Sequence, residues 1–265
     1  LGTLYWTRGE LPEAETYFRR TLYERERALD DNHPLLAESL NNLAILLDDL
    51  GREEEAEALY REALAAVEEA FGESSDHVSS ILGNLGLILS DRDDKGEAEA
   101  LFRRALSIDL ELLGPDHPSV AVDEINLGLL LCDADQTAEG VTLTSDAVRI
   151  LGGVLEAGQW EMGAARSAYG QCLGQTGRFA EGERELVAAL ETVETALGPD
   201  HSRVGQIRAR LAELYDAWGR PERARRIRDG GPAPRGGNPE SGFRSQREPP
   251  VTPVSRSGPT ISLSL

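Results

Sequence analysis

The chain has 265 residues, of which 40% are hydrophobic, and a formal net charge of −20. An acidic surface repels phosphate backbones and anionic lipids, so we expect neither nucleic acid nor a membrane surface to be a partner. Two cysteines are too few for a disulfide framework, and no apolar run is long enough to span a bilayer.

The start of the sequence predicts a short helix at 1–8 and a second helix from Pro12 to about Leu29, joined at Gly9. Proline is tolerated in the first turn of a helix, where its missing N–H has no partner to lose. Leu1 occupies the place in its helix that Leu43 occupies later in the chain. The first hairpin is therefore truncated, and we expect the chain to be a fragment of a longer protein.

The stretch 40–64 is the clearest hairpin in the chain. Leu40, Leu43 and Leu47 recur at helical spacing and predict one amphipathic helix, and the segment after Gly51 repeats the pattern with Glu and Arg on its outer face. We therefore expect two antiparallel helices with a tight turn at Gly51.

The rest of the chain repeats this hairpin every 42 residues. Steps of 42 from Gly51 reach Gly9, Asp93, Asp135, Gly177 and Gly219, and steps from Tyr60 reach Phe18, Phe102, Thr144, Leu186 and Arg228. Steps from Ala56 reach Ala14, Ala98, Gly140, Gly182 and Ala224, which are all small. A constant step without insertions predicts a repeat protein over residues 1–228.

The fourth and fifth repeats are degenerate. Asp135 replaces the turn glycine, Thr144 replaces the aromatic residue, and glycines crowd the segment 140–174. Because each glycine inside a helix costs about 0.5–1 kcal/mol relative to alanine, we expect this segment to be the least stable part. After residue 228 the composition changes to Gly, Pro, Ser and Arg, which predicts a disordered tail over 229–265.

The pattern resembles the tetratricopeptide repeat. The resemblance is carried by a leucine before a small residue, a turn glycine, a second small residue, an aromatic residue and an Ala-Leu pair. The usual unit has about 34 residues; the 42-residue unit, NNLA at 41–44 and LGPDHP at 113–118 are similar to kinesin light chains and their bacterial relatives. It implies an all-α right-handed superhelical solenoid that acts as a protein-interaction scaffold. The period alone also allows HEAT or armadillo repeats.

The sequence carries no catalytic motif: we find no phosphate-binding loop, HExxH, GxSxG or paired CxxC. We therefore expect no enzyme, no cofactor and no metal site. His33, His117 and His201 fall on one 42-residue series, so they report the repeat, and we expect Asp116 and Asp200 to cap the helices that follow them. Cys132 and Cys172 are predicted to be free, buried thiols, which agrees with a cytoplasmic location.

Helical spacing predicts which side chains line the concave face of the solenoid. They form an apolar floor with an acidic border, suited to a peptide with basic and apolar side chains. The candidate residues are Glu38, Asn41, Asn42, Ile45, Asp48, Asn84, Leu87, Asp91, Asn126, Leu129 and Asp133. Two alternatives stay open: the apolar members pack against the next repeat, and the asparagines bond a neighbouring helix.

These observations predict a non-catalytic scaffold that binds a peptide or protein segment. The alternative is a regulatory or docking region of a larger bacterial signalling protein, such as a Ser/Thr kinase with its catalytic domain upstream of Leu1.

Overall fold

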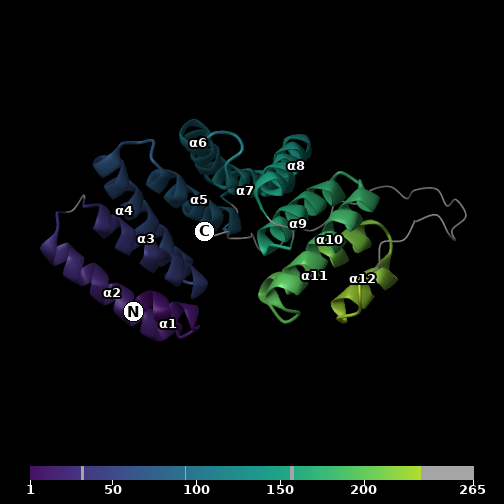
Figure 1. Ribbon diagram of the computed structural model, residues 1–265, viewed down its shortest axis with the longest axis horizontal. Coiled ribbons are helices and arrows are strands. Elements are labelled where there is room, and N and C mark those ends of the chain that lie inside the picture. Colours follow the sequence, from purple (N-terminus) through teal and green to yellow (C-terminus); the bar gives the residue numbers. More distant parts are fainter. Residues whose placement is uncertain (31–32, 93, 156–157, 234–265) are drawn as a thin grey trace, which may run out of the picture. The chain divides into compact units, whose positions relative to one another are not determined.

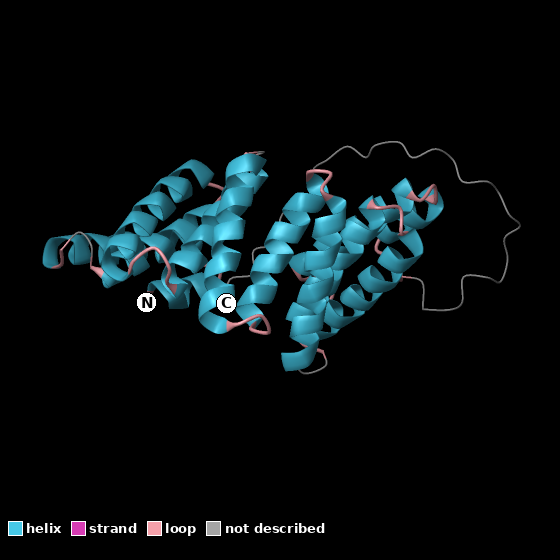
Figure 2. Ribbon diagram, turned by 90° about the horizontal axis from the view of Figure 1, so that it is seen from above, coloured by secondary structure: helices cyan, strands magenta, loops and turns pink. Residues whose placement is uncertain are grey.

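The computed structural model describes residues 1–30, 33–92, 94–155 and 158–233, and within them the chain forms twelve α-helices and no strand (Figure 1). The chain divides into two compact units, one that ends at Pro115 and one that begins at Asp116. Each unit is a stack of three antiparallel helical hairpins with short connections (Figure 2). The tail expected at 229–265 lies, from residue 234 onward, outside the described residues.

The first unit contains α1 to α6, and the second contains α7 to α12. The bounds in the first are α1 Gly2–Thr7, α2 Leu11–Ala28, α3 Pro34–Asp49, α4 Glu53–Phe71, α5 Asp76–Asp91 and α6 Lys95–Leu113. Those in the second are α7 Pro118–Asp133, α8 Thr137–Val154, α9 Trp160–Gln175, α10 Phe179–Leu197, α11 Ser202–Ala217 and α12 Pro221–Arg228. The complete first helices begin at residues 34, 76, 118, 160 and 202, which confirms the 42-residue period.

Within the described residues, the turn position on the series of Gly51 has a positive φ, which glycine adopts without a steric penalty. Gly51 has φ of 70° and Gly177 has φ of 79°. Asp135 has the same conformation, with φ of 63°. Within the described ranges, it is the only residue other than glycine that has a positive φ. Asp93, the other replacement on this series, lies outside them.

The linker histidines cap the first helices. Nδ1 of His33 accepts the backbone N–H of Leu35, and Nδ1 of His117 accepts that of Ser119, each at 3.2 Å. His201 does the same for Arg203. The expected capping by Asp116 and Asp200 is therefore wrong, because the N-cap position falls one residue later. Asp116 instead pairs with Arg149 at 2.8 Å.

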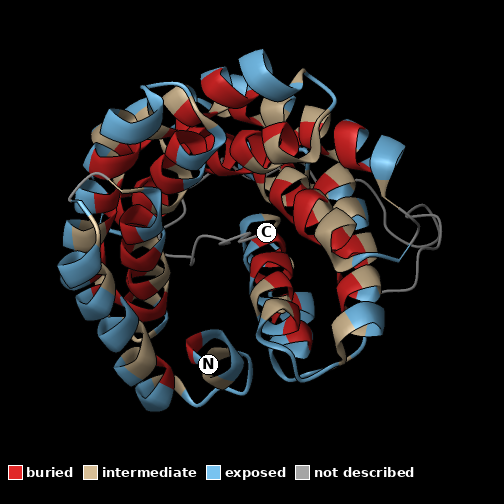
Figure 3. Cartoon of the chain, turned by 60° about the vertical axis from the view of Figure 1, so that its left-hand side comes forward, coloured by how far each residue is buried: buried red, intermediate tan, exposed pale blue. Residues whose placement is uncertain are grey.

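The two helices of each hairpin approach closely where a small residue on the first faces a larger residue on the second. A Cβ built on Gly86 would lie 2.6 Å from the ring of Phe102, and one built on Gly170 would lie 2.8 Å from Cγ of Leu186. Buried residues therefore gather where helices face one another, and the outer turns of the helices are exposed (Figure 3).

Several glycines between 140 and 182 serve this close packing. A Cβ on Gly182 would lie 2.7 Å from the backbone oxygen of Gly170, and a Cβ on Gly140 would lie 2.6 Å from that of Gly128. Gly152 and Gly153, near the end of α8, have open space or ordinary contact around them. The low stability expected from the glycine content of this segment stays a prediction. At several of these positions, however, the backbone of the neighbouring helix lies too close to accommodate the methyl group of alanine.

We predict that Gly182→Ala and Gly205→Ala have opposite effects on stability. The first forces the α9–α10 backbones apart and should destabilise the protein by about 1–3 kcal/mol. The second lies in α11 with nothing within 4 Å of its Cβ, so it should stabilise by about 0.5–1 kcal/mol through helix propensity. Urea unfolding followed by circular dichroism measures both, and equal effects of the two substitutions would contradict the packing role of Gly182.

A second prediction concerns Glu124, which stands 42 residues after Leu82 and is 9% exposed. Burial, followed by repulsion from Asp146, raises its pKa to about 7, and its Oε2 has no hydrogen-bond partner among the described residues. A carboxyl whose pKa is raised on folding contributes stability at low pH that is lost as the pH rises through the folded value.

Glu124→Leu should therefore stabilise the protein by about 1–3 kcal/mol at pH 8 and remove the loss of stability between pH 5 and 8. Glu124→Gln should flatten the pH dependence with a smaller gain, because its amide remains buried. Melting temperatures at pH 5 and pH 8 test both variants, and an unchanged pH profile in both would refute the assignment.

Candidate functional site

In the first unit, three aspartates meet at the carboxyl ends of α3 and α5. Asp48 is half-buried; burial, then the neighbouring Asp49, Asp91 and Glu53, raise its pKa to about 6. The structure thus brings Asp48 close to Asp91, although the 42-residue period pairs Asp91 with Asp49 and Asp48 with Ser90. A cationic side chain placed here would relieve the repulsion among these carboxylates.

The candidate Glu38 and the neighbouring Asp49 already have partners inside the stack. Glu38 pairs with Nη1 of Arg25 on α2 at 3.2 Å, and the same nitrogen donates to Ser39 at 2.7 Å. Asp49 accepts the indole N–H of Trp6 on α1 at 2.6 Å. Both residues therefore fasten α3 to the preceding hairpin, a role that the sequence pattern did not indicate.

The middle of this face is formed by Asn41, Asn42 and Ile45 on α3 and by Asn84 and Leu87 on α5. Leu43, Ala44 and Leu47 are fully buried, whereas Asn41, Asn42, Ile45 and Asn84 keep partial exposure. The Oδ1 of Asn41 is buried and has no hydrogen-bond partner among the described residues. Leu87 is 7% exposed, so it is largely core.

In the second unit the corresponding residues of α7 are more enclosed. Asn126 and Leu129 are each 3% exposed, and Oδ1 of Asn126 lacks a hydrogen-bond partner within the described ranges. Asp133 is half-exposed and accepts a hydrogen bond from Nε2 of Gln175 on α9 at 2.6 Å. Of these three residues, Asp133 is the one with substantial solvent contact.

Sequence reasoning missed the polar residues that α9 and α11 add to this face. Arg210 is buried, and Nη1 donates to Oγ of Ser167 at 3.1 Å. Burial lowers the pKa of its guanidinium to about 10, against the opposing effects of Asp133 and Glu213. The signal was present, because Arg210 stands on the same 42-residue series as Asn42, Asn84 and Asn126.

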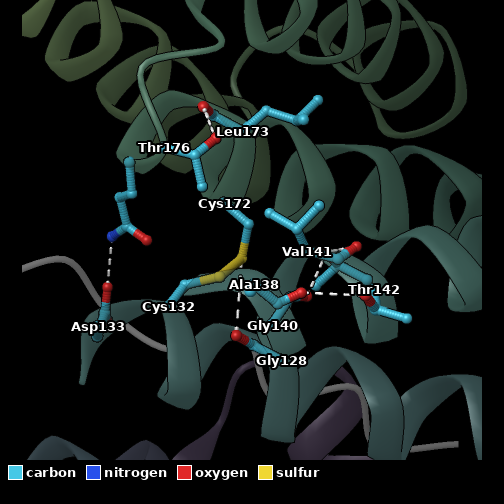
Figure 4. Close-up of a disulfide and its surroundings, with 12 residues drawn as sticks. Gly128, Cys132, Asp133, Ala138, Gly140, Val141, Thr142, Cys172, Leu173 and Thr176 are labelled. Atoms are coloured by element: carbon cyan, nitrogen blue, oxygen red, sulfur yellow. Dashed lines mark hydrogen bonds between the residues drawn. A yellow bond between two sulfur atoms is a disulfide. The ribbon is translucent and has the colours of Figure 1, made fainter. Parts of the chain in front are cut away.

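The two cysteines are not free. Cys132 of α7 and Cys172 of α9 form a disulfide with their Cα atoms 5.6 Å apart (Figure 4). Their separation of 40 residues places them on different positions of consecutive first helices, which lie against each other in the stack. The cysteines are buried as expected, but the expectation that they are free is wrong, and they no longer argue for a reducing compartment. A cytoplasmic location stays a proposal.

The site thus lies on the first helices of a helical-hairpin repeat protein. The model of the tetratricopeptide repeat family matches residues 1–69, 49–111, 77–151 and 161–227. These segments cover most of the chain, so the chain belongs to the tetratricopeptide repeat family. None of the described helices combines the length and apolarity needed to cross a membrane.

Solved structures with the same fold share little sequence with this chain. BtubC (BKLC) from P. vanneervenii is 19% identical with a TM-score of 0.64, over 93% of this chain and 99% of that protein. A kinesin light chain candidate from Podosopora anserina, with nearly identical TPR-like repeats, is 19% identical with a TM-score of 0.61, over 74% and 93%.

A Rap protein complexed with Competence and Sporulation Factor is also 19% identical, with a TM-score of 0.64, over 79% of this chain and 56% of that one. No curated protein matches the chain. The kinesin-light-chain-like repeat is therefore confirmed at the level of the fold.

The cluster at Asp48 predicts a pH effect on stability. Its raised pKa means that stability from this group is fully present below the unfolded pKa, near 4, and is lost as the pH rises through about 6. Asp48→Asn should therefore be more stable than the wild type at pH 7.5 and equally stable at pH 3.5. Urea unfolding at both pH values measures this. If the variant and the wild type were equally stable at pH 7.5, Asp48 would be well solvated and the prediction would be wrong.

Proposed function

We propose that this chain is a non-catalytic interaction scaffold that binds a peptide or protein segment along α3 and α5. The observation that carries the proposal is the group of carboxylates at Asp48, Asp49 and Asp91, beside the partly exposed Ile45. Repelling carboxylates next to apolar surface suit a segment that carries basic and apolar side chains. In the second unit, Asp133 is the proposed contact.

Membership in the tetratricopeptide family supports the scaffold, because stacked helical repeats present extended binding surfaces. The Rap protein, which has the same fold, is complexed with Competence and Sporulation Factor. Oδ1 of Asn41, which has no hydrogen-bond partner among the described residues, adds an acceptor for a peptide N–H if the side chain turns toward the surface.

A peptide-display selection on the full chain tests this proposal. Selected peptides should be enriched in Lys or Arg next to Leu, Ile or Val, and their affinity should fall as salt is raised. Asp48→Asn combined with Asp91→Asn should weaken binding at least tenfold. The matched control is Glu54→Gln with Glu62→Gln, which removes the same charge from exposed positions on α4 and should change affinity less than twofold.

The pH dependence gives an independent criterion. A basic peptide favours ionised Asp48, so affinity should rise between pH 5 and 7, through the pKa of about 6. In the Asp48→Asn variant this rise should disappear. Peptides without basic residues, or equal losses in the α4 control, would refute the acidic face as the binding site.

A further inference from the structure

The disulfide is buried beneath the candidate residue Asp133 of the second unit, which follows Cys132 directly in the sequence. On the 42-residue series, Cys132 corresponds to Asp48 and Ser90, and it stands next to Asp133 and one helical turn after Leu129. Cys172 corresponds to Leu46 and Ile88, which are core residues in the first unit. The bond therefore joins a buried position of α7 to a buried position of α9 (Figure 4).

The surroundings of the two sulfur atoms leave no free space. A Cβ on Gly140 would lie 2.4 Å from Sγ of Cys132, and Sγ of Cys172 lies 3.6 Å from the backbone oxygen of Gly128. Both cysteines are buried, at 2% and 0% exposure. Two thiol sulfurs cannot approach as closely as two bonded sulfurs, so reduction requires α7 and α9 to shift or a side chain to rotate into a packed wall.

Weaker links lie beside the covalent one. Asp133 accepts from Gln175 at 2.6 Å, which joins α7 to α9 one residue beyond Cys132. Ser167 accepts from Arg210 at 3.1 Å, which joins α9 to α11. Side-chain links therefore connect α7 to α9 and α9 to α11, and the disulfide is the strongest of these links.

We propose that Cys132 and Cys172 form a thiol–disulfide switch that sets the spacing of α7 and α9 and so controls partner binding on the face that carries Asp133. The second part rests on the proposed scaffold function. In the oxidised state the disulfide fixes the spacing of α7 and α9, and in the reduced state this spacing can vary.

The switching reagent is a dithiol. One of its thiolates attacks a cysteine Sγ, the disulfide breaks, and the other Sγ leaves as a thiolate that takes up a proton. The second thiol of the reagent then displaces the first cysteine. Two electrons and two protons pass from the dithiol to the cysteines, and the dithiol becomes a cyclic disulfide.

Burial makes this exchange dependent on local opening of the α7–α9 contact. A partner that binds across α7 and α9 in the oxidised geometry opposes that opening. By linkage, if reduction weakens the binding of a partner, the same partner must make the disulfide harder to reduce. Occupancy of the face and redox state are therefore coupled.

Hydrogen exchange read by mass spectrometry tests the switch on the full chain. The protein is compared after treatment with oxidised glutathione and after treatment with dithiothreitol, with alkylation under denaturing conditions to count thiols. The oxidised protein should contain no free thiol. After reduction, amides of α9 should exchange at least tenfold faster, and those of α3 and α5 should not change.

The double variant Cys132→Ala and Cys172→Ala should reproduce the fast exchange in α9 and should not respond to dithiothreitol. Two free thiols after treatment with oxidised glutathione would overturn the switch, and so would identical α9 exchange in both redox states.

The functional part is measured with a display-selected peptide whose affinity depends on Asp133, as judged with Asp133→Asn. Reduction should weaken its binding at least fivefold, and the peptide should slow reduction by dithiothreitol. Unchanged affinity would overturn control of binding. If no selected peptide binds in either redox state, the scaffold proposal and the control of binding both fail, and the exchange data still decide whether the disulfide sets the α7–α9 contact.

Discussion

The fold depends on a close contact between the two helices of each hairpin. In the first helix this contact uses a small residue, as at Ala44, Gly86 and Gly170, and in the second it uses a larger one, as at Tyr60, Phe102 and Leu186. A methyl group added at Gly86 would meet an aromatic ring, so the distance between the two helices is fixed by these pairs. Because each pair recurs after 42 residues, the first residues of the helices from α2 onward also recur after 42 residues.

In the fourth repeat this contact is rebuilt with smaller residues. Thr144 replaces the aromatic residue, and its Oγ1 donates to the backbone oxygen of Gly140 at 2.8 Å. Gly128 and Gly140 then let the backbones of α7 and α8 come together, and Cys132 fits against Gly140. The apparent degeneracy of this repeat is therefore a different solution to the same packing problem, and it places a sulfur where the second and third repeats have Asp48 and Ser90.

The period and the turn glycines predicted the helices because both follow from contacts within one hairpin. The gathering of acidic residues near Asp91 was partly predictable, since Asp49 and Asp91 hold the same position in adjacent copies and such positions must lie near each other. The other links were not. Trp6 and Asp49 are 43 residues apart, and Cys132 and Cys172 are 40 apart. These offsets from 42 join different helical positions, which depend on how successive hairpins are rotated and cannot be read from a repeat count.

The histidine caps show a further limit of pattern reading. Asp is a common N-cap residue, so Asp116 was the expected choice, but the proline at Pro118 fixes the first helical residue and makes His117 the cap. The imidazole Nδ1 then accepts the N–H that a carboxylate would otherwise take. Asp116 is left to pair with Arg149, which ties the linker to α8 of the same hairpin.

The two units treat charge on their first helices differently. In the second unit, Asp133 accepts a hydrogen bond from Gln175, and Arg210 supplies a nearby positive charge, so this carboxylate has favourable partners within the chain. In the first unit, Asp48 faces Asp49, Asp91 and Glu53, and its raised pKa reflects unfavourable burial and repulsion. Such repulsion persists because Leu43 and Leu47 anchor the opposite side of α3 in the core. A positively charged side chain bound beside Asp48 would reduce this repulsion, which is the physical basis for proposing a basic partner.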